Sequence, residues 1–177
     1  AIAAFVAQYP SLWPVLLAIA AGGFALSWMI KATGKSWLGK SITSAMALVE
    51  RKDALQRFPG RGAIMLFIGA GLTALIFRKE AVPAIIILAV GDSISHLAGR
   101  FFGRTKWLFA QEKSVEGSAS GFVFAAAAAA LIVPVWMAIA AAAAGMTVEA
   151  LHLKILNRKI DDNLTVPVAA AAVIWAL

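Results

Sequence analysis

Long apolar runs, separated by short polar segments, dominate this chain. The runs are continuous rather than alternating, which favours membrane-spanning helices over the strands of a barrel. Several are shorter than the roughly 20 residues that a span prefers. We predict six spans: Leu12–Ile30, Gly62–Phe77, Ala81–Ala98, Ala119–Val133, Pro134–Ala150 and Leu164–Leu177. The pattern therefore predicts an all-α, polytopic transmembrane helical bundle that forms a single domain over residues 1–177.

The composition agrees with this class. Of the 177 residues, 62% are hydrophobic and only 14% are charged, against about 25% charged in soluble domains. The absence of cysteine excludes disulfides and thiolate metal sites. The first residues lack the basic stretch of a cleavable signal, so we expect none. Basic cytoplasmic loops explain the net charge of +7 better than nucleic acid does, and we expect no nucleic-acid partner.

The basic residues predict the orientation of the bundle. With six spans, 14 of the 16 Lys and Arg residues fall in loops on one side, and only Arg78 and Lys79 fall on the other. Because basic loops stay in the cytoplasm, we expect an integral membrane protein with both termini outside, in the plasma membrane if the source is prokaryotic.

Between Trp37 and Phe58, apolar residues recur at roughly helical spacing among basic ones. This predicts an amphipathic helix on the inner leaflet, with a plain linker helix as the alternative.

Asp92 is the first polar anomaly, because an acid inside a span is costly unless it is paired. His96 and Arg100 follow at i+4 and i+8 and so share a helical stripe with it. Glycines such as Gly103 permit close approach of a neighbouring helix or a ligand. A purely structural pair of Asp92 with a Lys or Arg is the alternative. We expect His96 itself to be a hydrogen-bonded core histidine.

Polar residues from separate loops should gather at the cytoplasmic boundary. The predicted topology brings together Asp92, Glu149, Asp162, Asn163, Lys113, Glu116 and Ser118. Carboxylate and amide oxygens suit a Mg²⁺ ion that keeps waters and phosphate oxygens in its shell. Lys113 and the backbone N–H groups around Gly117 suit phosphate oxygens. The side chains of three further basic residues can neutralise more of the phosphate charge: Arg100, Arg104 and Lys106. These residues predict a Mg²⁺–nucleotide site at the inner face.

Three ordered motifs also resemble the CTP-dependent lipid kinases, the family of dolichol kinase, phytol kinase and the yeast-type diacylglycerol kinase. Residues 91–103 resemble that family's "GD, then G, then G" motif, residues 113–118 match "KSxEGS" and residues 162–167 match "DNLTxP". Glu149 stands where the family has an acid. The match runs from about Gly91 to Pro167, and the three motifs are specific only together. Ser95 replaces a common Ala, and His96 is atypical.

The resemblance implies that CTP donates its γ-phosphate to the hydroxyl of a membrane lipid alcohol: a polyprenol or dolichol, a phytol-type isoprenoid alcohol or a diacylglycerol. It implies Mg²⁺ as cofactor, organised by Asp92, Asp162 and Asn163. It implies catalytic roles for Asp92, Glu116, Glu149 and Asp162, any of which can be the base. Residues implied to bind the nucleotide are Arg100, Gly103, Lys106, Lys113, Ser114, Gly117, Ser118 and Asn163.

Two other functions compete with a lipid kinase. The related phosphatidate cytidylyltransferases share an Asp before a Gly-rich helix and a "KSxEG"-like stretch, which makes CDP-lipid synthesis the first alternative. Their C-terminal "KD", "PGHGG" and "DRxDS" elements are missing from this sequence. The second alternative is a small ion-coupled transporter with Asp92 and Glu149 as cation sites. Acids confined to one side and the lack of an internal repeat weigh against it. The expected partners are CTP, a lipid alcohol and the bilayer, and the sequence leaves a homo-oligomer open.

Overall fold

The computed structural model describes residues 13–33, 60–108, 110, 113–151, 154–155 and 158–177. Over these residues the regular secondary structure is helical apart from one short antiparallel pair, β1 with β2, and an isolated antiparallel bridge joins Lys106 to Ser114. The elements are α2 (Trp13–Thr33), α5 (Arg61–Phe77), the 3₁₀ turn η1 (Arg78–Glu80), α6 (Ala81–Phe102), α7 (Val115–Ala129), α8 (Val135–Leu151), β1 (Lys154–Ile155), β2 (Arg158–Lys159) and α9 (Asp162–Ala176). The all-α class is thereby confirmed. The amphipathic helix predicted between Trp37 and Phe58 lies outside the described residues.

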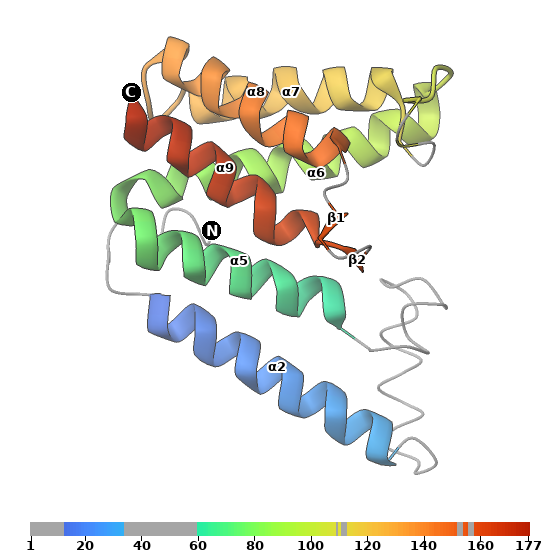
Figure 1. Cartoon of the computed structure of the whole chain (residues 1–177), viewed down its shortest axis with the longest axis vertical. Coiled ribbons are helices and arrows are strands. Elements are labelled where there is room, and N and C mark those ends of the chain that lie inside the picture. Colours follow the sequence, from blue (N-terminus) through green and yellow to red (C-terminus); the bar gives the residue numbers. More distant parts are fainter. Residues whose placement is uncertain (1–12, 34–59, 109, 111–112, 152–153, 156–157) are drawn as a thin grey trace.

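Successive helices run in alternating directions, so the connections fall at two ends of a bundle (Figure 1). One end, called here the polar end, holds the end of α6, the start of α7, the end of α8, the β1–β2 pair and the start of α9. The other end holds η1, the short α7–α8 connection and the C-terminus. Segments that are far apart in the sequence therefore meet at the polar end.

Alanine forms most of the core. In the larger buried cluster, 9 of the 13 residues are Ala, contributed by α6, α7, α8 and α9. A smaller cluster around Leu16, Ala74 and Ile85 joins α2, α5 and α6. Large apolar side chains such as Trp28, Phe124 and Trp175 instead lie mostly exposed on the outside. Small core residues let the helix backbones approach one another closely, as in membrane bundles.

Helices α6 and α7 pack backbone to backbone through glycines. A Cβ on Gly117 would lie 2.6 Å from the carbonyl oxygen of Ser95, and one on Gly121 would lie 2.7 Å from that of Gly91. Real Cβ atoms do not come this close to backbone oxygens, so any larger residue would push the two helices apart. This contact fixes the start of α7 against the second half of α6, where the polar residues lie.

The predicted spans agree with six of the observed helices to within four residues at each end. Within the described part of the chain, one continuous helical stretch, Arg61–Phe102, contains a window long and apolar enough to cross a membrane, with a mean hydropathy of 1.7. This stretch comprises α5, η1 and α6. The remaining apolar helical segments in the described part of the chain are 10–17 residues long, with α2 counted over Trp13–Met29. Helix positions are thus confirmed, while the six-span arrangement stays a prediction.

Candidate active site

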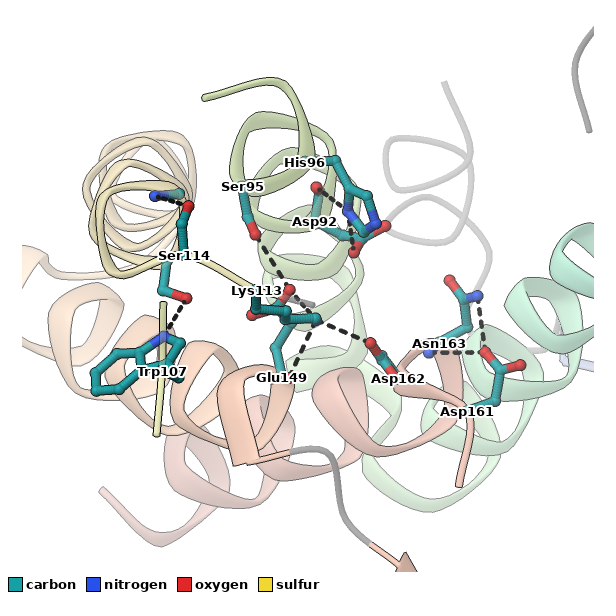
Figure 2. A network of polar contacts seen from close by, with 12 residues as sticks. Asp92, Ser95, His96, Trp107, Lys113, Ser114, Glu149, Asp161, Asp162 and Asn163 are labelled. Atoms are coloured by element: carbon teal, nitrogen blue, oxygen red, sulfur yellow. Dashed lines mark hydrogen bonds and ion pairs between the residues drawn. The ribbon is translucent and has the colours of Figure 1, made fainter. Parts of the chain in front are cut away.

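Lys113 connects two carboxylates at the polar end (Figure 2). Its Nζ donates to Glu149 Oε1, to the Glu149 carbonyl oxygen at 3.1 Å and to Asp162 Oδ2 at 3.0 Å. Glu149 is only 1% exposed, and the Lys113 and Asp162 side chains are 10% and 19% exposed. A buried carboxylate is tolerated only when it is paired and hydrogen-bonded. Lys113 therefore stabilises the buried Glu149 and links the start of α7 to α8 and α9.

The two oxygens of Glu149 differ in their surroundings. Oε1 accepts from Lys113 and, at 3.1 Å, from Ser95 Oγ. Oε2 is buried and has no hydrogen-bond partner among the described residues. Buried polar atoms are nearly always satisfied, so an exception calls for an explanation, such as a bound ion or water. Sequence reasoning missed Ser95, although it stands one residue before His96 on the stripe that begins at Asp92.

Asp92, His96 and Glu149 form a compact group. One potential ligand atom from each lies within 4.8 Å of the others. His96 Nδ1 is 3.1 Å from Asp92 Oδ1 and 3.0 Å from the Asp92 carbonyl oxygen. The His96 side chain is 59% exposed, so the expectation of a core histidine was wrong. The reason is that His96 stands on a face of α6 that lines cavities at the polar end rather than the alanine core.

The start of α9 is fixed by its own cap. Asp161 Oδ1 accepts from the Asn163 backbone N–H at 3.3 Å and from Asn163 Nδ2 at 3.0 Å, and Arg61 Nε lies 3.8 Å from Asp161 Oδ2. A Cβ on Gly69 would collide with the carbonyl oxygen of Asn163, so α5 also approaches this turn closely. The Asn163 amide, predicted to bind metal and nucleotide, is thus used in part to order the turn. An Asp immediately before an apolar helix is the N-cap signal that could have predicted this role of Asp161.

The "KSxEGS" segment forms the start of α7. Ser114 is the N-cap, and its buried Oγ accepts from the Gly117 backbone N–H at 3.1 Å. A Cβ on Gly103 would lie 2.7 Å from the same oxygen, which explains the glycine there by space. Glu116 accepts from the backbone N–H of Thr105 at 3.0 and 3.2 Å. Ser114, Gly103 and Glu116 therefore hold together the connection between α6 and α7.

Two cavities lie at the polar end, on either side of His96. One, of about 710 Å³, is lined by Ser93, Ser95, His96, Leu97, Gly99, Arg100, Lys106, Lys113 and Ser114. The other, of about 680 Å³, is lined by Arg61, Asp92, His96, Ile160, Asp161, Asp162 and Asn163. The first carries three basic side chains and suits an anion, whereas the second is rich in carboxylates and suits a cation. We call them the basic cavity and the acidic cavity.

A third hollow, the apolar groove, is formed by α7 and α8. It has a volume of about 380 Å³ and is lined by Trp107, Val115, Ser118, Ala119, Phe122, Ala143, Met146, Thr147, Ala150 and Leu151. Ser118 accepts a hydrogen bond from Trp107 Nε1 at 3.1 Å. Ser118, predicted to bind the nucleotide, thus belongs to this apolar groove and not to the lining of the two polar cavities.

The structure brings together most of the predicted site residues but separates a few. Asp92 and Asp162 line the acidic cavity, Arg100 and Lys106 line the basic cavity, and Lys113 bonds to Asp162 while lining the basic cavity. Glu116 and Gly117 are not among the residues that line either polar cavity.

Comparisons with protein-family models, curated proteins and solved structures give no match for this chain.

Proposed function

We propose that this protein is a membrane-embedded lipid kinase that transfers the γ-phosphate of CTP to the hydroxyl of a lipid alcohol. The observation that carries the proposal is the position of Lys113, which lines the basic cavity and at the same time bonds to Glu149 and Asp162. Phosphoryl transfer requires cations on the phosphates and oxygen ligands for a divalent ion within one site. Both sets of groups converge on this side chain.

The distribution of apolar residues supports a membrane location. Side chains such as Phe124, Trp136 and Trp175 are more than half exposed, while alanines fill the core. Water would penalise such a surface, whereas lipid would not. At about 1.5 Å per residue, helices of 15–22 residues are about 22–33 Å long, close to the roughly 30 Å of a bilayer core. We therefore propose that all six helices cross, with the polar end in the cytoplasm because most basic residues lie in its loops.

The basic cavity is the proposed nucleotide site. Arg100, Lys106 and Lys113 line it, and their charges match a triphosphate. Its volume of about 710 Å³ falls in the roughly 300–1,000 Å³ range of small-molecule pockets. The choice of CTP over other nucleotides rests on the resemblance to the CTP-dependent kinases.

The acidic cavity fits a divalent ion. The hard oxygen donors that Mg²⁺ requires are the carboxylates of Asp92 and Asp162 and the buried Glu149 Oε2, which has no hydrogen-bond partner in the described part of the chain. Mg²⁺, when bound, neutralises phosphate charge during the transfer. These three side chains would hold it, while Lys113 keeps Glu149 Oε1 and Asp162 Oδ2 in place.

The apolar groove is the proposed site for the tail of the acceptor. It is lined by the start of α7 and the end of α8, and its lining residue Ala150 adjoins Glu149 in the chain. A lipid lying there can place its hydroxyl beside the carboxylates. The hydroxyl oxygen then bonds to the γ-phosphorus, the bond between that phosphorus and the bridging oxygen breaks, CDP leaves, and a carboxylate accepts the hydroxyl proton.

The proposal is tested with CTP radiolabelled at either the α- or the γ-phosphate and a panel of lipid alcohols. We expect purified protein in lipid nanodiscs to transfer label to lipid only from the γ position. Lys106→Met should raise the KM for CTP by about tenfold, the value of one lost charge-assisted contact. Lys79→Met, at the opposite end of the bundle, should leave it unchanged. Label transferred from the α position would indicate CDP-lipid synthesis instead, and no transfer from either position would refute both activities.

A further inference from the structure

The group of Asp92, His96 and Glu149 contains a nitrogen donor as well as oxygens. We infer that this group binds a first-row transition-metal divalent cation through His96, in preference to Mg²⁺. One potential ligand atom from each residue lies within 4.8 Å of the others. Two atoms bound to opposite sides of one ion, with bonds of about 2.0–2.2 Å, lie about 4.0–4.4 Å apart, so small side-chain movements would bring all three atoms into contact with the ion. The inference rests on the proposed function and deepens it by replacing Mg²⁺ with a transition metal as the ion of that site, but ion binding can be measured without any kinase activity.

Burial makes Glu149 the anchor of this site. The residue is 1% exposed, yet its Oε2 has no hydrogen-bond partner among the described residues. Leaving a buried carboxylate oxygen without a partner is costly. Because Oε1 is already bound by Lys113 and Ser95, Oε2 can bind an ion without breaking either contact.

The orientation of His96 fits a metal ligand. Its Nδ1 lies against Asp92 Oδ1 and the Asp92 carbonyl oxygen, at 3.1 and 3.0 Å. A carbonyl oxygen can only accept, so the contact with the Asp92 carbonyl favours the tautomer that carries its proton on Nδ1, which leaves the lone pair on Nε2. A histidine held by a backbone carbonyl or a carboxylate through one nitrogen and bound to metal through the other is a recurrent arrangement in metal sites. Asp92 thus orients the ring and also supplies a carboxylate to the group.

The local charge fits a divalent ion. Asp92, Glu149 and Asp162 contribute three negative charges, and Lys113 contributes one positive charge through its contacts with Glu149 and Asp162. Carboxylates therefore outnumber the ammonium within this set of four side chains, which favours a cation. An imidazole nitrogen binds first-row transition metals far better than Mg²⁺, and two carboxylates keep the site acceptable to Mn²⁺.

Pulsed electron paramagnetic resonance with Mn²⁺ tests the inference, because bound Mn²⁺ reports a coordinated nitrogen directly. The full chain, freed of any histidine tag, is loaded with Mn²⁺ in nanodiscs. The sequence has only two histidines, His96 and His152, so the assignment is simple. We expect nitrogen modulation in the wild type and in His152→Gln, and its loss in His96→Gln. We also expect Mn²⁺ to displace Mg²⁺ in competition, and His96→Gln to weaken Mn²⁺ binding by roughly 10–100-fold.

The outcomes separate this inference from the proposed function. Nitrogen modulation that is lost in His96→Gln supports the inference even if no lipid is phosphorylated. Mn²⁺ that binds without nitrogen modulation, modulation that persists in His96→Gln, or failure to bind Mn²⁺ would each overturn it. Transfer from CTP supported by Mg²⁺ alone, with no nitrogen modulation, would overturn the inference and leave the kinase proposal intact.

Discussion

Replacing Lys113 by Met should strongly destabilise the fold. Met keeps most of the length of the side chain but removes the ammonium that contacts Glu149 and Asp162. Glu149 is 1% exposed, so its charge would be left inside the bundle without compensation. Removing one partner of a buried ion pair costs about 3–5 kcal/mol. That is a large part of the roughly 5–15 kcal/mol by which most domains are stable.

A double-mutant cycle identifies the cause of this loss. Glu149→Gln removes the buried charge and keeps the shape, so Lys113→Met should cost much less when it is made in the Glu149→Gln background. We expect an interaction energy of roughly 2–3 kcal/mol, the upper part of the range for residues in contact. Asp162 remains in both backgrounds, but its 19% exposed side chain lets solvent carry more of its charge.

The assay is reversible unfolding in mixed detergent micelles, followed by far-ultraviolet circular dichroism. Lys79→Met provides the control, because Lys79 is exposed on η1 at the opposite end, and it should change the free energy of unfolding by less than about 0.5 kcal/mol. The reasoning would be refuted if Lys113→Met cost less than about 1 kcal/mol, the level of an exposed ion pair. Strictly additive effects of Lys113→Met and Glu149→Gln would refute it as well.

Two further predictions concern helix packing and the apolar groove. Gly121→Ala should lower the free energy of unfolding by about 1–3 kcal/mol, because the new Cβ would lie 2.7 Å from the Gly91 carbonyl oxygen. Gly22→Ala is the control: a Cβ at Gly22 would have nothing within 4 Å, so this variant should not be destabilised. Equal melting temperatures for these two variants would contradict the packing argument. Ala143→Trp should fill the apolar groove and raise the KM for the lipid alcohol without changing CTP binding. Ala127→Trp is the control, because Ala127 lies on the exposed surface of α7 and does not line the groove; it should change neither the KM for the lipid alcohol nor CTP binding. An unaltered lipid KM in Ala143→Trp would place the acceptor elsewhere.

The sequence predicts the helices well because their apolar runs are long and end at clear polar positions. The larger differences occur where a helix continues into polar surroundings. Helix α6 extends four residues past the predicted Ala98, since backbone hydrogen bonds do not require apolar side chains. Helix α7 begins at Val115 rather than Ala119 because Ser114 caps it, and a Ser followed by an acid in the first turn is a start signal readable from sequence.

The candidate site is predictable as a location but not as a set of contacts. Alternating helices bring the second half of α6, the end of α8 and the start of α9 to one end whatever the rotation of each helix (Figure 1). These segments carry Asp92, Glu149 and Asp162. Which oxygen meets which nitrogen depends on rotation and on the space between helices. Ser95 on α6, for example, reaches Glu149 on α8, and these two helices lie so close that a Cβ on Gly145 of α8 would be 3.2 Å from Ile87 of α6. The hydrophobic pattern carries no information on such distances.

The polar end contributes to the fold as well as to binding, because the alanine core provides little specificity in lipid. Lipid tails are as apolar as the core, so helices in a bilayer are held by close packing and by polar contacts between them. Lys113, bound to α8 and α9 from the start of α7, is such a contact. A ligand that had to break it would pull the helices apart. Because Glu149 presents Oε1 to Lys113 and leaves Oε2 without a partner among the described residues, an ion can bind at Oε2 while the contacts between the helices stay in place. Ion binding should therefore add to the stability of the bundle rather than compete with it.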